Sequence, residues 1–193
     1  GCDGISGCPW SSHFCLEIQE ETEEEAEQIA GYMQWCLEKM FPREVVIRDP
    51  GIYKDEMRYL RQGLWSNRTV QSLNIQGHLT DGFLDALRLG LSTNPRLTSL
   101  SLSSQGVIES SLNILSNGLK LNSSLKCLTL YGNAFIGDKL LKLSEGLQLN
   151  SSISEFSLRN SDFDDESCTV VADILTKSCS IEVVYLYDNF IHD

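Results

Sequence analysis

Basic residues and histidines are scarce in this 193-residue chain, and long apolar runs are missing. Fifteen lysines and arginines stand against 27 aspartates and glutamates, for a net charge of −12. Nucleic acids and anionic membrane surfaces both require a basic face, so we expect neither as a partner. No segment approaches the roughly 18 apolar residues that a membrane-spanning helix needs, so we also expect no membrane insertion.

The sequence also lacks the usual combinations of catalytic residues. Its three histidines, His13, His78 and His192, lie far apart, and no known catalytic motif flanks them. The G-x-S-x-G, H-E-x-x-H and G-x-x-x-x-G-K-[ST] motifs are all missing. We therefore predict that the chain is not an enzyme, that it uses no cofactor, and that His78 is a structural residue of a turn.

Cysteine is present in an odd number, seven, and is unevenly spread. Cys2, Cys8 and Cys15, with His13, are candidate zinc ligands, but the paired C-x-x-C spacing of a specific zinc site is missing. Reduced thiols and a disulfide among these three cysteines remain as alternatives. Cys168 falls in a helix column that holds a leucine one unit earlier, so we expect it to be buried. Reduced thiols favour a cytoplasmic location.

What the chain does contain is a repeat. The segment from Leu121 to Asn133 has apolar residues at Leu125, Leu128 and Leu130. The first of these positions recurs at intervals of 27, 28, 28 and 28 residues, at Val70, Leu97, Leu125, Ile153 and Ile181. Two further apolar columns keep this register, namely Leu73, Leu100, Leu128, Phe156, Val184 and Ile75, Leu102, Leu130, Leu158, Leu186. Val45 and Ile47 extend both columns into a degenerate sixth strand.

Between the strands, the pattern L-x-x-L-x-x-G-L recurs around Gly90, Gly118 and Gly146, and a variant of it surrounds Gly63. Spacings of three and four residues place the leucines on one face of a helix. Each unit is therefore a strand followed by an amphipathic helix. Neither element can bury its apolar face alone, so the units are expected to stack.

The period, the strand followed by a full helix, and the segment Leu125 to Asn133 resemble the ribonuclease-inhibitor type of leucine-rich repeat. This type is similar to the repeat region of NOD-like receptors and to the Ran GTPase-activating protein. The resemblance covers residues 42–193 and implies an α/β fold, a right-handed solenoid or horseshoe with a parallel concave sheet and outer helices. It implies about five to six units. The turn asparagine of the pattern is present at Asn133 and Asn189, whereas other residues replace it at Pro50, His78, Gln105 and Ser161.

Residues 1–41 depart from the repeat, and we interpret them as an N-terminal capping segment with an acidic helix. Nine acidic residues stand here against Lys39 alone. Residues 1–13 should be irregular, and Phe14, Leu16 and Ile18 alternate as in a strand. A helix is expected from Glu20 to Lys39, with its apolar side made by Ile29, Tyr32, Met33, Cys36, Leu37 and Met40. Its acidic first turns are either a docking patch for a basic partner or a solvated helix end that the helix dipole favours.

The other end of the chain stops one strand after a helix, at Asp193. A stack of repeats that ends on its core face is expected to be unstable or prone to association. We therefore expect the array to be truncated there, and the natural protein to continue.

Asparagines recur in four of the turns that join a helix to the next strand, at Asn67, Asn94, Asn122 and Asn150. Asn67, Asn122 and Asn150 also form N-x-[ST] sequons, so their glycosylation would indicate an extracellular protein. Because Asn94 occupies the same turn without a sequon, we predict that these asparagines serve the backbone. The acidic cluster from Ser161 to Glu166 is likewise expected to cap a helix, not to bind calcium.

Strand residues between the core leucines must face the concave side. The residue types there that commonly anchor protein interfaces are our candidate binding residues. They are Arg48, Gln76, Tyr131, Arg159, Tyr185 and Tyr187. We predict a non-catalytic scaffold that recognises a protein partner through this face, within a larger receptor or regulator whose other domains are further candidate partners. The alternative is a GTPase-activating or GTPase-regulating protein similar to the Ran activator.

Overall fold

The computed structural model describes most of the repeat region and parts of the N-terminal segment. The described residues are 5–6, 13–17, 31, 32, 34, 35, 37, 39, 42–48, 62, 63, 66–77, 79–103, 109–132, 137–160 and 164–189. Residues 31, 32, 34, 35, 37 and 39 are helical, as are 62, 63 and 66. His78, Asn133, Cys2 and Cys8 lie outside the described residues, as does the acidic run before residue 31.

The described strands form one sheet in which the strand order follows the chain order. The strands are β1 (Ile5–Ser6), β2 (His13–Glu17), β3 (Glu44–Arg48), β4 (Ser72–Gln76), β5 (Ser99–Ser103), β6 (Cys127–Tyr131), β7 (Glu155–Arg159) and β8 (Val183–Tyr185). From β2 to β8 every neighbouring pair is parallel. The register joins residues 27 or 28 apart, for example Leu100 with Leu128 and Leu128 with Phe156, as the repeat predicts.

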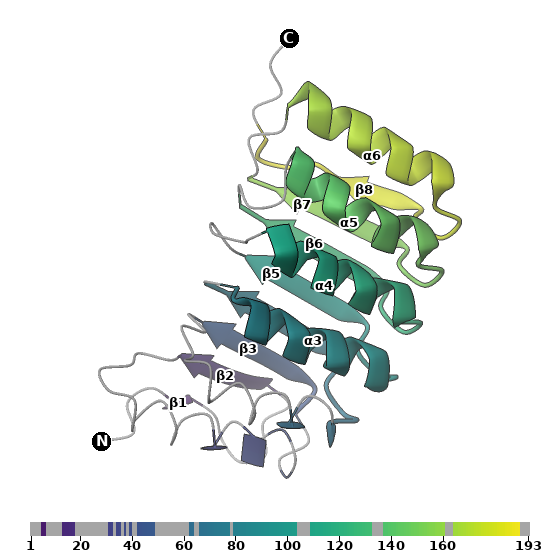
Figure 1. Ribbon diagram of the computed structural model, residues 1–193. Helices are drawn as coiled ribbons and strands as arrows, with labels where there is room; N and C mark the ends of the chain where they lie inside the picture. The colour runs from purple at the N-terminus through teal and green to yellow at the C-terminus, as the bar shows by residue number, and fades with distance from the viewer. Residues whose placement is uncertain are drawn as a thin grey trace.

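Four helices are described along their whole length, and they cover one face of the sheet, stacked beside one another in chain order (Figure 1). They are α3 (Asp81–Thr93), α4 (Glu109–Leu121), α5 (Asp138–Leu149) and α6 (Asp165–Lys177). The predicted inner columns of the strands are buried between sheet and helices, together with the leucines of the helix motif. The core is thus shared by neighbouring units, which confirms the predicted strand-plus-helix repeat.

The sheet begins before the repeats. β2 contains Phe14 and Leu16 and pairs in parallel with β3, so the strand predicted in the N-terminal segment is confirmed. The prediction that residues 1–13 are irregular is wrong at Ile5–Ser6, where β1 pairs antiparallel with β2. An edge strand exposes unpaired backbone N–H and C=O groups, and β1 covers part of that edge.

The turn asparagines bind the backbone, as predicted. Asn150 is fully buried, and its Oδ1 accepts hydrogen bonds from the N–H groups of Ser152 and Ile153, both at 2.8 Å. Its Nδ2 donates to the carbonyls of Leu119 and Asn122 in the preceding unit, at 2.7 and 2.9 Å. Each such side chain therefore holds its own turn and ties it to the unit before.

The same arrangement recurs along the array. Asn122 donates to the Leu91 carbonyl at 2.8 Å, and Asn67 donates to the Leu37 carbonyl at 2.7 Å. Asn94 donates to the Val70 carbonyl at 3.1 Å. All three asparagines are buried, so the sequons at Asn67, Asn122 and Asn150 present no accessible acceptor nitrogen in the folded chain.

The glycines of the helix motif allow neighbouring helices to approach closely. A Cβ atom built on Gly146 would lie 2.6 Å from the Ser116 carbonyl oxygen of α4, which is too close for any side chain. The Gly146 N–H also donates to Ser116 Oγ at 3.0 Å. The motif therefore requires glycine at this position, because the backbone and side chain of Ser116 in α4 fill the space beside it.

Helix α6 departs from the predicted burial pattern. Cys168, which the repeat column predicts to be buried, is exposed, and Leu175 is exposed as well. The buried face is Ser167, Val170, Val171 and Ile174. Val171 and Ile174 are buried at the positions that Leu143 and Gly146 occupy in α5, so the helix keeps the repeat register. Cys168 and Leu175 are exposed because α6 is the last described helix of the stack and packs against α5 alone among the described helices (Figure 1).

The start of α6 is capped as predicted from its acidic cluster. Asp164 Oδ1 accepts hydrogen bonds from the Ser167 backbone N–H at 2.8 Å and from the Ser167 hydroxyl at 2.6 Å. These bonds lower the pKa of the Asp164 carboxyl. Ser167 Oγ also accepts from the Gly137 N–H at 2.9 Å, which links α6 to the start of α5.

In the N-terminal helical residues, Leu37 is buried as predicted. Tyr32, which we placed on the apolar side, is 37% exposed and stacks on the exposed Trp35 with ring centroids 5.9 Å apart. The tyrosine is covered by a neighbouring ring on the surface and does not enter the core. Other members of that predicted apolar side lie outside the described residues.

Replacing Leu128 by alanine should destabilise the protein by about 2 to 5 kcal/mol, because it empties a fully buried position between two units. Denaturant unfolding measures this change. The matched control is Leu121→Ala, since Leu121 is 64% exposed, and it should change stability by less than about 0.5 kcal/mol. Equal losses in the two variants would contradict the assigned core.

Replacing Asn150 by alanine should cost about 3 kcal/mol or more, because it leaves two buried N–H groups and two carbonyls without their partner. Asn117→Ala, on an exposed position of α4, is the control and should be nearly neutral. Asn150→Asp keeps the acceptor but loses the donor, so its loss in a thermal or denaturant melt should be similar to that of alanine. A neutral Asn150→Ala would show that the turns do not depend on this side chain.

Candidate protein-binding site

The face of the sheet opposite the helices carries the alternate residues of each strand, and we call it the open face. It has three rows across the sheet. The start row is Glu44, Ser72, Ser99, Cys127, Glu155 and Val183; the middle row is Val46, Asn74, Ser101, Thr129, Ser157 and Tyr185; the end row is Arg48, Gln76, Ser103, Tyr131 and Arg159. Tyr187 follows β8 in a turn.

All six candidate binding residues lie in or beside these rows, but the structure separates them. Arg48 and Gln76 are paired neighbours on β3 and β4. Tyr131 and Arg159 are paired neighbours on β6 and β7, two strands further along the sheet from Gln76. Tyr185 and Tyr187 lie at the β8 side. Ser103 therefore stands between two groups of large side chains.

Backbone bonds beyond the strand ends keep the end row aligned. The N–H of Gly132 donates to the Arg159 carbonyl at 3.0 Å, and the N–H of Asn160 donates to the Tyr187 carbonyl at 3.3 Å. Gly132 and Asn160 both have positive φ, of 94° and 49°, which glycine and asparagine tolerate well. Tyr187 is thus held next to Arg159 although it lies outside β8.

Arg159 joins the aromatic residues into one cluster. Its guanidinium carbon lies 5.1 Å from the centroid of the Tyr187 ring, a cation–π contact. The Tyr187 ring stacks on Tyr185 with centroids 5.2 Å apart and planes 25° apart. Asp188 Oδ2 lies 4.0 Å from an Arg159 nitrogen, and both side chains are largely exposed, so this ion pair contributes little.

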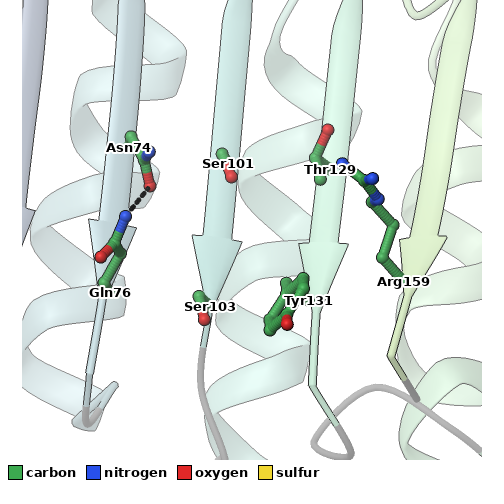
Figure 2. Close-up of a pocket in the computed structure, with 7 residues that line it drawn as sticks. All are labelled: Asn74, Gln76, Ser101, Ser103, Thr129, Tyr131 and Arg159. Atoms are coloured by element: carbon green, nitrogen blue, oxygen red, sulfur yellow. Dashed lines mark hydrogen bonds between the residues drawn. The ribbon is translucent and has the colours of Figure 1, made fainter. Parts of the chain in front are cut away.

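A hollow of about 320 Å³ lies on the open face between these groups. Its lining comprises Asn74, Gln76, Ser101, Ser103, Thr129, Tyr131 and Arg159. Figure 2 shows the small serines of β5 between the amides of β4 on one side and Tyr131 and Arg159 on the other. Gln76 Nε2 donates to Asn74 Oδ1 at 3.5 Å, so the two amides form one wall.

Asn74, Ser101, Ser103 and Thr129 are lining residues that the sequence did not suggest. Small polar rows contain no residue types that commonly anchor interfaces, so in the sequence they carry little binding signal. Their importance is their size, because short side chains between long ones leave a depression in the face. In the sequence, the sign of this depression is a run of alternate serines, which Gln76 and Tyr131 flank in the repeat register.

Cys127 and Glu155 form a second polar contact on the open face. Burial, together with the charge of Glu155 and a hydrogen bond to it, raises the pKa of the Cys127 thiol. A thiol with a raised pKa is a poor nucleophile at neutral pH. Among the described residues, no group of three or more histidine, cysteine, aspartate or glutamate side chains is arranged to hold a metal ion. Cys2 and Cys8 lie outside the described residues, so the structure does not decide between the zinc and disulfide alternatives.

Comparison with known protein families and with curated proteins finds no match. A solved structure named Leiomodin-1 Actin-Binding Site 2 (ABS2) is similar, with a TM-score of 0.54 and 16% sequence identity. The alignment covers 82% of this chain and 90% of that one. The two chains share a fold. At this identity the likeness extends to the fold alone, and the actin binding in that name belongs to leiomodin.

The sequence predicts that neither membranes nor nucleic acids are partners, and two features of the described residues bear on that prediction. Within the described ranges, no helix has the length and apolar content required to cross a membrane. The described part of the open face carries both signs of charge, with arginines at Arg48 and Arg159 and glutamates at Glu44 and Glu155. It therefore has no continuous basic stripe of the kind that nucleic-acid backbones require.

Cys127 should react slowly with iodoacetamide at pH 8, and Glu155→Gln should raise its rate several-fold. The reason is that removing the carboxylate lowers the thiol pKa and so increases the thiolate fraction. Mass spectrometry of the labelled peptides measures each cysteine separately. The exposed Cys179 is the internal control and should react at the same rate in both proteins. An unchanged Cys127 rate would mean that Glu155 does not control this thiol.

Proposed function

We propose that this chain is a leucine-rich repeat protein of the ribonuclease-inhibitor type, similar to the repeat region of NOD-like receptors. In this proposal the units form a right-handed solenoid, and the open face is the concave side of a horseshoe. The parallel register of 27 or 28 residues and the helices on one face support it. The buried turn asparagines add further support, because a repeat must join each unit to the next.

The function that we propose is a non-catalytic scaffold that binds a protein partner through the open face. The observation that carries it is the cluster of Tyr131, Arg159, Tyr185 and Tyr187 beside a polar hollow. Tyr131 is 41% exposed and Tyr187 is 50% exposed, although large aromatic side chains gain most when buried. Tyrosine and arginine are the residue types most often responsible for binding energy at protein interfaces.

The fold positions this cluster for binding with little ordering cost. Tyr131 and Arg159 extend from strands paired on both sides, Tyr185 extends from β8, which pairs with β7, and Tyr187 extends from a turn bonded to Asn160, so the backbone is already fixed. Stacking of Arg159, Tyr187 and Tyr185 restricts their rotamers before a partner arrives. Pre-organisation of this kind lowers the entropy lost on association.

Actin is the first partner to test, because the similar leiomodin structure is an actin-binding site and no sequence match suggests another protein. The alternative of a GTPase regulator predicts that the chain stimulates hydrolysis by a purified GTPase. No contact in the described residues favours it, and it stays a prediction from the resemblance.

We further propose a cytoplasmic location. Cys168 and Cys179 are exposed free thiols, which persist in a reducing compartment. The sequon asparagines are buried and bonded to the backbone, which opposes glycans at Asn67, Asn122 and Asn150. A glycan found at any of the three in the protein from its native source would contradict this proposal.

The binding proposal is tested by changing Tyr131, Arg159 and Tyr187 together to alanine. Binding to purified actin, and capture of partners from native extract, are compared for this variant and the unchanged chain. We expect loss of the captured partner, by about tenfold or more in affinity, with a nearly unchanged melting temperature because Tyr131 and Tyr187 are exposed and Arg159 is only partly buried.

The control variant changes three exposed leucines of the helical side, Leu121, Leu141 and Leu149, to alanine. It removes comparable apolar area from the opposite side of the sheet and should retain the partner. If the helical variant lost the partner and the open-face variant kept it, the binding surface would lie on the helices and the proposal would be wrong.

A further inference from the structure

Six neutral side chains line the hollow and make few hydrogen bonds to the described protein. They are the amides of β4, the hydroxyls of β5 and β6, and the phenol of β6, namely Asn74, Gln76, Ser101, Ser103, Thr129 and Tyr131. In the part of the chain that the structure describes, the bond from Gln76 to Asn74 is the one hydrogen bond that these side chains make. A ligand that displaces water from the hollow must therefore supply partners for their other donors and acceptors.

The bond between Gln76 and Asn74 decides which groups of the β4 wall remain for a ligand. Gln76 Nε2 donates to Asn74 Oδ1 at 3.5 Å (Figure 2). Asn74 keeps both N–H groups of Nδ2 as donors, and Gln76 keeps Oε1 as an acceptor. The wall thus combines a donor group with an acceptor group, in place of two groups of one kind.

Hydroxyls continue this mixed character across β5 and β6. Ser101 and Ser103 pair with the two amides of β4 in the register, and Thr129 pairs with Ser101. Each hydroxyl can both donate and accept. Figure 2 shows the Tyr131 ring directed from β6 toward Ser103 on β5, so an apolar ring lies beside the polar floor.

Arg159 also lines the hollow, but its guanidinium already has contacts in the protein. The guanidinium carbon lies 5.1 Å from the centroid of the Tyr187 ring, and one nitrogen lies 4.0 Å from an oxygen of the Asp188 carboxylate. An arginine beside an aromatic ring and a carboxylate does not require a second anion. We assign no ligand contact to Arg159, and the rest of the lining is neutral.

A charged group matches this neutral lining poorly. A carboxylate only accepts and finds no donor in Gln76 Oε1, whereas an ammonium only donates and finds no acceptor in Asn74 Nδ2. Either would also exchange its hydration for uncharged partners, which is costly. A primary amide has an acceptor oxygen and two N–H donors, so it can accept from Asn74 and donate to Gln76 or to a hydroxyl at once.

We propose that the hollow receives the side chain of a glutamine or asparagine from the partner protein, with its amide bonded to Asn74 and Gln76 and its stem against Tyr131. This inference rests on the proposed function, since it names the chemistry by which the open face recognises its partner. The site thereby prefers partners that present a neutral amide over partners that present an acid or a base at the same position.

Size and lining favour a protein side chain over a separate small molecule. A volume of about 320 Å³ is at the lower end of small-molecule sites, which cover roughly 300 to 1,000 Å³ and are mostly apolar. Here the lining is mostly polar and lies on the same open face as the exposed Tyr131 and Tyr187. A protein segment on that face can reach the hollow and these aromatic rings together.

The experiment uses a displayed library of random twelve-residue peptides as the probe. It is selected in parallel against the full chain, Gln76→Glu and Ser103→Leu, whose larger side chain fills the floor of the hollow. Two controls make the same changes away from the lining: Gln71→Glu in the turn before β4, and Ser92→Leu on an exposed position of α3. Thermal melting of each variant checks that it folds as the unchanged chain does.

We expect the full chain and both controls to enrich peptides that share a glutamine or asparagine. Gln76→Glu leaves a wall that needs a donor, so it should favour lysine or arginine instead, and Ser103→Leu should lose the amide peptides. A synthetic copy of an enriched peptide should bind the full chain about tenfold more weakly when its amide is changed to the corresponding acid, which keeps the size and removes the donors.

Four results would overturn the inference. Peptides that share no amide side chain, and whose binding is lost in Tyr131→Ala, would keep the open face as a binding surface and remove the amide from it. Peptides that share an acidic residue would assign the hollow to a carboxylate. Amide peptides equally enriched by Ser103→Leu would move their recognition away from the hollow. No enrichment on the full chain would count against both the amide and the proposed binding function.

Discussion

A buried asparagine follows the helix at Asn67, Asn94, Asn122 and Asn150 and ties each of these units to the one before, whereas Ser178 takes this place after α6. At Asn150 the side-chain oxygen accepts from the two N–H groups just before the next strand, and the amide donates to a carbonyl at the end of α4 and to one in the turn that follows it. Both ends of the side chain are thus used inside a core that water cannot reach, where an unmade hydrogen bond is expensive. This bond fixes the start of a strand relative to the strand before it, and the parallel register of the sheet follows from that.

The two faces of the sheet have different roles once the register is set. The inner leucine columns and the glycine contact between α4 and α5 provide cohesion on the helical side. On the open face no side chain is needed for the core, so residues there are free to differ between units. Serines at Ser101 and Ser103 leave a depression, and the larger Tyr131 and Arg159 border it. A binding surface can therefore vary in such a protein without loss of the fold.

Sequence periodicity predicted the strands, their inward columns, the helix faces of the regular units and the asparagine turns, since all of these repeat a local requirement. It failed where one unit departs from the rest. In α6 Cys168 takes the column of the buried Leu140, yet it is exposed because no described helix covers that side of α6. Tyr32 fits an apolar helix side, yet it stacks on Trp35 at the surface. β1 is too short to show any pattern, and only its pairing with β2 reveals it.

For the candidate site, too, the sequence determined one part and the tertiary structure decided the rest. The alternation of strand residues determined, without any structure, that Arg48, Gln76, Tyr131, Arg159 and Tyr185 share one face. Which of them act together was decided by the tertiary structure. Arg159 meets Tyr187 through a turn bonded across strands, and the hollow exists because small side chains stand between large ones. Periodicity describes each residue's own direction, whereas a pocket and a cation–π contact depend on the sizes and rotamers of side chains about 28 residues apart.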